Sequence, residues 1–174
     1  MLILTALVAL ACAFLLPKPR GLGRLKAATT GPKISVDDAL RLARSPTFFV
    51  FLATTAALQS AHAMLFTFGT LHWQSLGISP ETIGLLWSIA MLAEITLFAF
   101  ATPFVRRFGV VKLLAASGIA SCVRWLVFAT DPPLAIQFVC QAMHCVTFGF
   151  AYLAAMQFVA SAVPERLTAT AQGL

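Results

Sequence analysis

The chain alternates between long apolar stretches and short polar connections. Four of the apolar stretches contain only three charged residues between them: residues 47–70, 82–103, 109–130 and 133–163. A helix needs about 20 mostly apolar residues to cross the hydrocarbon core of a bilayer, and each stretch is that long. The pattern predicts four membrane-spanning helices within residues 47–163. A shorter uncharged stretch, residues 1–16, predicts part of another such helix.

The composition supports this interpretation and excludes other classes of protein. Hydrophobic residues make up 60% of the chain, charged residues 10%, and the mean hydropathy is +0.90. A soluble domain carries about 45–50% apolar and about 25% charged residues, so this chain has too few charges to cover a soluble surface. We therefore expect an all-α membrane protein, and neither a soluble globule nor a disordered chain.

The basic residues predict the orientation in the membrane. Eleven of the twelve Lys and Arg residues fall in residues 17–46, in residues 106–112 or in the tail at 164–174, which the predicted topology places on one side. The connections on the other side, residues 71–81 and 131–132, contain none. Because cytoplasmic loops carry an excess of Lys and Arg, the basic side is predicted to be cytoplasmic. This accounts for the net charge of +6 without a nucleic-acid partner.

The long basic connection, residues 17–46, is predicted to be a cytoplasmic linker. It is rich in Gly, Pro and basic residues up to Lys33, which favours an extended chain. Ser35 and Asp38 form a start signal for a short helix over residues 36–43. We interpret this helix as a surface helix at the lipid headgroups; a regulatory partner site is the alternative.

Glu94 is a candidate proton-coupling residue. Counted at 1.5 Å per residue, it lies about 18 Å from the outer end of its span, near the bilayer midplane. Inserting an acid at that depth costs about 3 kcal/mol, and burial there favours the neutral, protonated carboxyl. A carboxyl group that gains and loses a proton suits proton coupling. The alternative is a neutral Glu that shares a hydrogen bond with a neighbouring helix.

Two Gln-x-x-His pairs are candidate solute-binding residues. Gln59 and His62 lie on one span and Gln141 and His144 on another, and the i, i+3 spacing places each pair on one helix face. Both pairs lie roughly 12–17 Å from the outer ends of their spans, close to the depth of Glu94. We predict that the pairs contact solute and that His144 assists proton coupling. Hydrogen bonding between helices is the alternative.

Arg124 is the third candidate, about 9 Å below the outer end of its span. A long Arg side chain can extend over that distance to the interface. The alternative is a guanidinium that faces a cavity and holds a solute carboxylate through two parallel hydrogen bonds. Trp125 and Trp73 lie near the same end and are predicted to anchor the protein at the membrane interface.

Enzyme chemistry is not expected. The sequence contains no H-E-x-x-H, G-x-S-x-G or Walker motif, so no catalytic residue and no cofactor is predicted. Cys12, Cys122, Cys140 and Cys145 all lie inside apolar stretches without C-x-x-C spacing, which argues against a metal site.

Residues 104–112, F-V-R-R-F-G-V-V-K, resemble the cytoplasmic D-R-x-G-R-K motif of the major facilitator superfamily. Arg107 and Gly109 match the Arg and Gly of the motif. Arg106 stands where the motif has an acidic residue, and Lys112 closes the segment. A long basic loop followed by short-looped hairpins is also similar to the middle and second half of such a transporter.

Seven further segments resemble one branch of the superfamily, the phenylpropionic acid transporter-like or nucleoside/proton symporter-like branch. They are residues 60–63, 71–74, 83–87, 93–94, 123–125, 141–149 and 164–173. The resemblance implies a partial major-facilitator bundle, from the end of helix six through helices seven to ten to the start of helix eleven. Residues 164–174 would be a cytoplasmic loop and that start. The N-terminal half of the transporter would then be a missing partner.

The sequence therefore predicts a fragment of a proton-coupled secondary transporter in the bacterial cytoplasmic membrane. Its expected partners are protons, membrane lipid and a small organic solute, with an aromatic carboxylate as first choice from the resemblance and from Arg124. A nucleoside or sugar symporter is the alternative within transport. A non-transporting membrane scaffold subunit is the alternative from another class.

Overall fold

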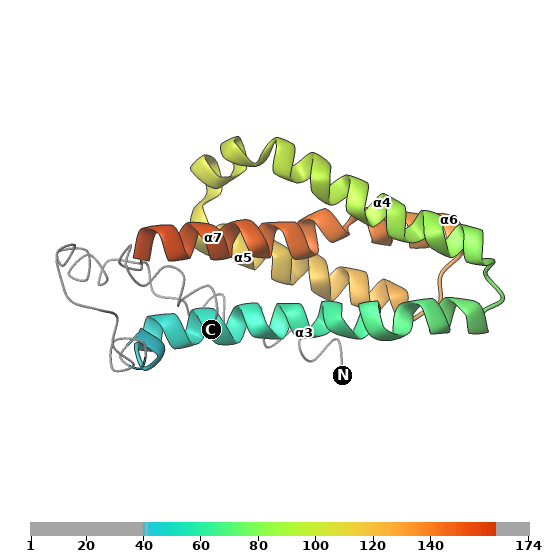
Figure 1. Ribbon diagram of the computed structural model, residues 1–174, viewed down its shortest axis with the longest axis horizontal. Helices are drawn as coiled ribbons and strands as arrows, with labels where there is room; N and C mark the ends of the chain where they lie inside the picture. Colours follow the sequence, from blue (N-terminus) through green and yellow to red (C-terminus); the bar gives the residue numbers. More distant parts are fainter. Residues whose placement is uncertain (1–39, 41, 163–174) are drawn as a thin grey trace.

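The computed structural model describes residues 40 and 42–162, and these residues form an antiparallel helical bundle (Figure 1). Its elements are α3 (Pro46–Ser75), α4 (Pro80–Ala99), α5 (Ala101–Phe128), α6 (Leu134–Ala142), the π-helical segment η2 (Cys145–Gly149) and α7 (Phe150–Ala162). The predictions for residues 1–16 and 164–174, and most of the short helix predicted at 36–43, lie outside the described residues.

Among the residues that the structure describes, four helices are long and apolar enough to cross a membrane. They are Pro46–Ser75, Pro80–Ala99, Arg107–Phe128 and the combined last span, Leu134–Ala162. Large apolar side chains such as Phe49, Leu92 and Ile95 are exposed on the outside of the bundle. They suit a lipid environment, because lipid tails are as apolar as these side chains. The prediction of an all-α membrane protein is confirmed.

The helix starts follow from local sequence. Pro46 and Pro80 each stand at the first position of a helix, where the missing N–H of proline leaves no hydrogen bond unmade. Ser79 caps α4, because its hydroxyl accepts a hydrogen bond from the Thr82 N–H at 3.3 Å. The connection from α3 to α4 consists of residues 76–79, and the two helices run in opposite directions (Figure 1).

The region of the superfamily-like motif differs from the sequence prediction. We expected a turn between residues 103 and 109, but α5 already begins at Ala101. Pro103 is compatible with this because it lies in the first helical turn. The helix is interrupted only at Gly109, whose φ of 70° and ψ of 171° are non-helical. Glycine adopts such a positive φ without the steric cost that a Cβ would impose.

The last span is one apolar stretch in the sequence but is interrupted in the structure. Between α6 and α7 the chain forms η2, which begins directly after His144. A π-helical turn takes more residues than an α-helical turn, so it changes the direction in which the following side chains point. At its end, η2 packs tightly on α4, since a Cβ at Gly149 would overlap the Leu97 side chain.

Two apolar cores flank the middle of the bundle. The larger core joins α3, α5 and α7, and includes Phe51 and Phe158, whose rings stack with centroids 4.1 Å apart. The smaller core lies toward the other end and includes Trp73, Ile83 and Leu86. On α3, His62 lies between the two cores, after Leu58 of the larger one and before Trp73 of the smaller one.

Candidate functional site

Five buried polar side chains meet in the middle of the bundle, and each is at most 1% exposed. They are His62 on α3, Arg124 on α5, Gln141 on α6, His144 directly after α6, and Thr147 on η2. We call these five residues the polar cluster. The depth matching in the sequence predicted the approach of His62, Gln141 and His144. It did not predict Thr147.

Arg124 is completely buried, so it does not extend to the membrane interface. Its Nη2 donates a hydrogen bond to Gln141 Oε1 at 2.6 Å, and its Nη1 donates to Thr147 Oγ1 at 3.1 Å. The guanidinium carbon lies 5.4 Å from the ring centroids of both Trp125 and Phe128. Within the described part of the chain no carboxylate forms an ion pair with it, and its Nε has no hydrogen-bond partner.

Helix α4 contributes two contacts to this region. Gln141 Nε2 donates to the backbone oxygen of Leu86 at 3.4 Å. Glu94 Oε2 lies 3.3 Å from His144 Nε2, and 15% of the Glu94 side chain is exposed. The carboxyl group therefore lies at the edge of the polar cluster, between His144 and the surface of the described bundle.

His62 has a defined set of contacts. Its Nδ1 lies 2.8 Å from the backbone oxygen of Leu58, and its Nε2 lies 3.0 Å from Thr147 Oγ1. A carbonyl oxygen can only accept, so Nδ1 must carry a hydrogen. The His62 and His144 rings meet edge to face with centroids 5.2 Å apart. A proton on either ring would therefore act directly on the other.

Thr147 connects three members of the polar cluster, although sequence reasoning missed it. Its hydroxyl contacts His62 Nε2, Arg124 Nη1 and, at 3.3 Å, the backbone oxygen of His144. Ser117 on α5 donates to the backbone oxygen of Thr147 and so ties η2 to α5. The only signal in the sequence was that Thr147 extends the three-residue spacing of Gln141 and His144.

Gln59 is not part of this cluster. It is exposed on α3, while His62, one turn further along, is buried. The i, i+3 spacing leaves about 60° between the two side chains around the helix, and that angle separates the exposed and buried faces here. A role for Gln59 in solute binding stays a prediction.

The residues of the superfamily-like motif lie far along α5 from the polar cluster. Arg107 and Lys112 are exposed on either side of the Gly109 interruption. The side chain of Arg106 lies outside the described part of the structure.

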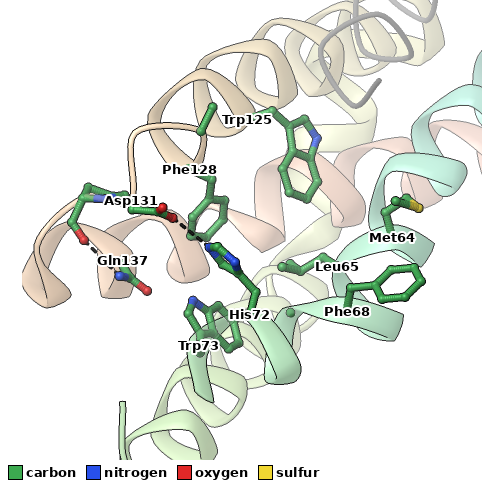
Figure 2. A pocket seen from close by; sticks show the side chains of 12 residues that line it. Met64, Leu65, Phe68, His72, Trp73, Trp125, Phe128, Asp131 and Gln137 are labelled. Carbon is green, nitrogen blue, oxygen red and sulfur yellow. Dashed lines mark hydrogen bonds and ion pairs between the residues drawn. The ribbon is translucent and has the colours of Figure 1, made fainter. Parts of the chain in front are cut away.

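A cavity of about 530 Å³ lies at the end of the bundle that the charge pattern predicts to be outer (Figure 2). Residues from α3, α5 and α6 line it, among them Phe68, Trp73, Trp125 and Phe128. The prediction that Trp73 and Trp125 are interfacial anchors is wrong. They are 2% and 3% exposed, because their rings pack between helices.

A hydrogen-bonded pair of side chains lies at this cavity. His72 Nε2, at the end of α3, is 2.7 Å from Asp131 Oδ1, in the turn after α5. Figure 2 shows the two side chains pointing toward each other beside Phe128. The pair is half exposed, and it links the two helices at the predicted outer end.

Comparison with known proteins identifies the family. The model of the MFS_1-like family matches residues 1–174. The chain belongs to the MFS_1-like family. The resemblance to the major facilitator superfamily is therefore confirmed, and so is the prediction of a multi-pass integral membrane protein of the bacterial cytoplasmic membrane. The family and the relatives below are transporters, which confirms that the chain is not an enzyme.

Three curated relatives are bacterial transporters. The probable 3-phenylpropionic acid transporter of Escherichia coli is 37% identical over 64% of this chain and 29% of its own length. The uncharacterized transporter YwbF of Bacillus subtilis is 29% identical over 80% of this chain and 35% of its own length. The maltose permease of Geobacillus stearothermophilus is 33% identical over 57% of this chain and 25% of its own length. The chain thus spans about a third of these relatives or less. No solved structure shows a significant match.

In this MFS_1-like chain, the polar cluster combines a fixed cation with groups that can carry a proton. Arg124 provides N–H donors, and Gln141 and Thr147 hold two of its nitrogens in place. His62, His144 and the adjacent Glu94 can each gain or lose a proton. Such a combination can bind an anionic group and respond to protons at the same place.

Proposed function

We propose that this chain is part of a proton-coupled secondary transporter that moves a small aromatic carboxylate across the cytoplasmic membrane. The observation that carries the proposal is the guanidinium of Arg124, which is fully buried and has no carboxylate partner among the described residues. A solute carboxylate would supply the missing negative charge.

The electrostatic argument concerns the energy of a buried cation. Removing a charge from water is expensive, and an opposite charge with good hydrogen-bond geometry offsets much of that cost. Arg124 is held by two neutral oxygens, from Gln141 and Thr147, and its Nε has no hydrogen-bond partner among the described residues. A carboxylate can accept two parallel hydrogen bonds from one edge of a guanidinium. Since Arg124 is covered in this conformation, the residues around it must move to admit the solute.

The aromatic part of the proposed solute follows from the surroundings of Arg124. Trp125 and Phe128 lie beside the guanidinium and also line the 530 Å³ cavity, which is within the usual size range for small-molecule sites. One relative carries the name probable 3-phenylpropionic acid transporter, which supports the same solute class.

The proton part of the proposal assigns Glu94 and His144 to proton coupling. They lie 3.3 Å apart, and Glu94 is partly exposed while His144 is buried. A proton gained or lost by the Glu94 carboxyl group would therefore act on the polar cluster through His144. Gln59, His62, Arg124, Gln141 and His144 are the proposed solute-binding residues.

Transport requires more than this chain. Major facilitator transporters work by movement of two halves about a central site, and this chain spans about a third of its relatives. We propose that an N-terminal half completes the transporter, and we call the full-length protein that contains this segment the intact transporter.

Uptake into liposomes tests the proposal. With the intact transporter, an inward proton gradient should drive accumulation of 3-phenylpropionate above the external concentration, and a protonophore should remove that accumulation. Empty liposomes treated in the same way are the control, because the neutral acid can cross lipid unaided. Uptake that equals this control, or that does not depend on the gradient, would contradict the proposed function.

A sugar symporter is the second candidate, because the maltose permease is 33% identical to part of this chain. A sugar has no carboxylate, so it would use Gln141, His144 and the aromatic rings and would not need the charge of Arg124. Proton-driven uptake of maltose, with no uptake of 3-phenylpropionate above the control, would favour this candidate.

A further inference from the structure

We propose that Thr147 couples the protonation of His62 to solute binding at Arg124. The hydroxyl hydrogen of Thr147 is donated to His62 Nε2 while His62 is neutral, and it turns to the backbone oxygen of His144 when His62 takes up a proton. This inference rests on the proposed proton-coupled function. It adds Thr147 as a positioning residue and His62 as a further proton site to that function.

The donors and acceptors around Thr147 allow two hydrogen-bonding states of its hydroxyl group. Arg124 Nη1 always donates, so it occupies one lone pair of Thr147 Oγ1 in both states. His62 Nδ1 carries a hydrogen for the backbone oxygen of Leu58, so a neutral His62 leaves Nε2 as an acceptor. The 3.0 Å contact then requires the Thr147 hydroxyl to donate to Nε2.

Protonation of His62 reverses the direction of the hydrogen bond between His62 Nε2 and the Thr147 hydroxyl. The proton that is taken up binds Nε2, and the new Nε2–H donates to Thr147 Oγ1, which now accepts from both His62 and Arg124. The hydroxyl hydrogen turns to the backbone oxygen of His144, 3.3 Å away. No heavy atom has to leave contact distance, and no covalent bond of Thr147 is broken.

The charges make the second state dependent on an anion. Protonated His62 and Arg124 would be two cations on one hydroxyl oxygen, and like charges close together in a buried place repel strongly. A carboxylate bound to Arg124 offsets that repulsion, so solute binding favours the proton on His62. Because such coupling is reciprocal, the proton on His62 also favours solute binding.

Other titratable groups lie near His62 and Arg124, and their charge also affects the protonation of His62. The His144 ring lies beside the His62 ring, and Glu94 lies beside His144. Cys140 and Cys145 are the other titratable side chains near Arg124. None of these four groups contacts the Thr147 hydroxyl through its side chain, since the contact with His144 is to the backbone oxygen. The hydroxyl is therefore the direct link between His62 and Arg124.

The test compares two variants of Thr147 in the intact transporter. Thr147→Val keeps the shape and removes the hydroxyl, whereas Thr147→Ser keeps the hydroxyl. Thr54→Val is the matched control, because Thr54 is also fully buried and its hydroxyl bonds to Val50 in its own helix. The readout is the dissociation constant for 3-phenylpropionate as a function of pH, with 3-phenylpropionamide as the neutral ligand.

We expect the wild type to bind the carboxylate form of the acid, with the acid's own ionisation taken into account, about tenfold more tightly when His62 takes up a proton at lower pH. Thr147→Val should lose most of this pH dependence, while Thr147→Ser and Thr54→Val should keep it. The amide should bind independently of pH in every protein. If the acid binds Thr147→Val with the wild-type pH profile, Thr147 has only a structural role and the inference is wrong.

The outcomes separate this inference from the function on which it rests. A wild type whose accumulation of the acid does not depend on the proton gradient would overturn both. A wild type with proton-driven accumulation whose binding of the acid does not depend on pH would overturn only this inference. A wild type with proton-driven accumulation whose pH profile survives in Thr147→Val would overturn only the role of Thr147. If Thr147→Val does not fold, a Thr147→Ser variant that lacks the pH dependence would also contradict the inference.

Discussion

Arg124→Gln in the intact transporter should weaken binding of 3-phenylpropionate by about 3 kcal/mol or more, which is about a hundredfold or more in the dissociation constant. The substitution removes the only positive charge in the polar cluster that does not depend on protonation. Binding of the neutral 3-phenylpropionamide should change only a few-fold, so the difference between acid and amide should nearly vanish.

Arg124→Lys makes the same test more specific. Lysine keeps the charge but loses the planar guanidinium with its two parallel donors. We therefore expect Arg124→Lys to weaken binding of the acid more than binding of the amide. The difference in affinity between acid and amide that remains should be larger than in Arg124→Gln. Equal losses for acid and amide in both variants would show that Arg124 is structural. Arg44→Lys, at an exposed position, is the control and should bind both ligands as the wild type does.

Glu94→Gln should abolish proton-driven accumulation while sparing exchange of solute across the membrane. The amide cannot release a proton, but it keeps the size of the carboxyl group, so the contact with His144 can still form. Accumulation against a gradient should fall to the level of equilibration, and counterflow of labelled solute should stay within a few-fold of the wild type.

The matched control for Glu94 is Glu81→Gln. Glu81 is an exposed acid in the first turn of the same helix, and its replacement should leave both measurements unchanged. Unchanged accumulation by Glu94→Gln at several pH values would assign Glu94 a structural role and leave proton coupling to the histidines.

The spans could be predicted from the sequence because hydrocarbon thickness sets a minimum apolar length. Depth along a span was also predictable, since each helical residue adds about 1.5 Å. This is why His62, Gln141 and His144 meet in the structure as expected. Depth does not predict the direction in which a side chain points around the helix. It therefore could not predict that Gln59 is exposed or that Arg124 is buried inside the bundle.

Local departures from regular helix were the hardest to predict. The interruption at Gly109 and the π-helical segment Cys145–Gly149 both occur inside apolar stretches, where no polar connection marks them. Thr147 was missed for a related reason. Buried threonines in helices commonly bond to the backbone of their own helix, as Thr54 does, so the residue type alone does not indicate a contact between helices.

The tryptophans show how burial by neighbours overrides a sequence preference. Trp73 and Trp125 lie near the ends of their spans, where interfacial tryptophans are common. In the structure both rings are enclosed by other helices, and Trp125 lies next to the Arg124 guanidinium. Position along the chain does not distinguish a tryptophan at the membrane interface from one that is buried between helices.

The most direct test of the central claim is a structure of the intact transporter bound to 3-phenylpropionate. We predict that the solute carboxylate lies about 3 Å from the guanidinium nitrogens of Arg124, with its ring beside Trp125 or Phe128. A bound solute whose carboxylate lies elsewhere, while Arg124 keeps its contacts with Gln141 and Thr147 alone, would contradict the claim.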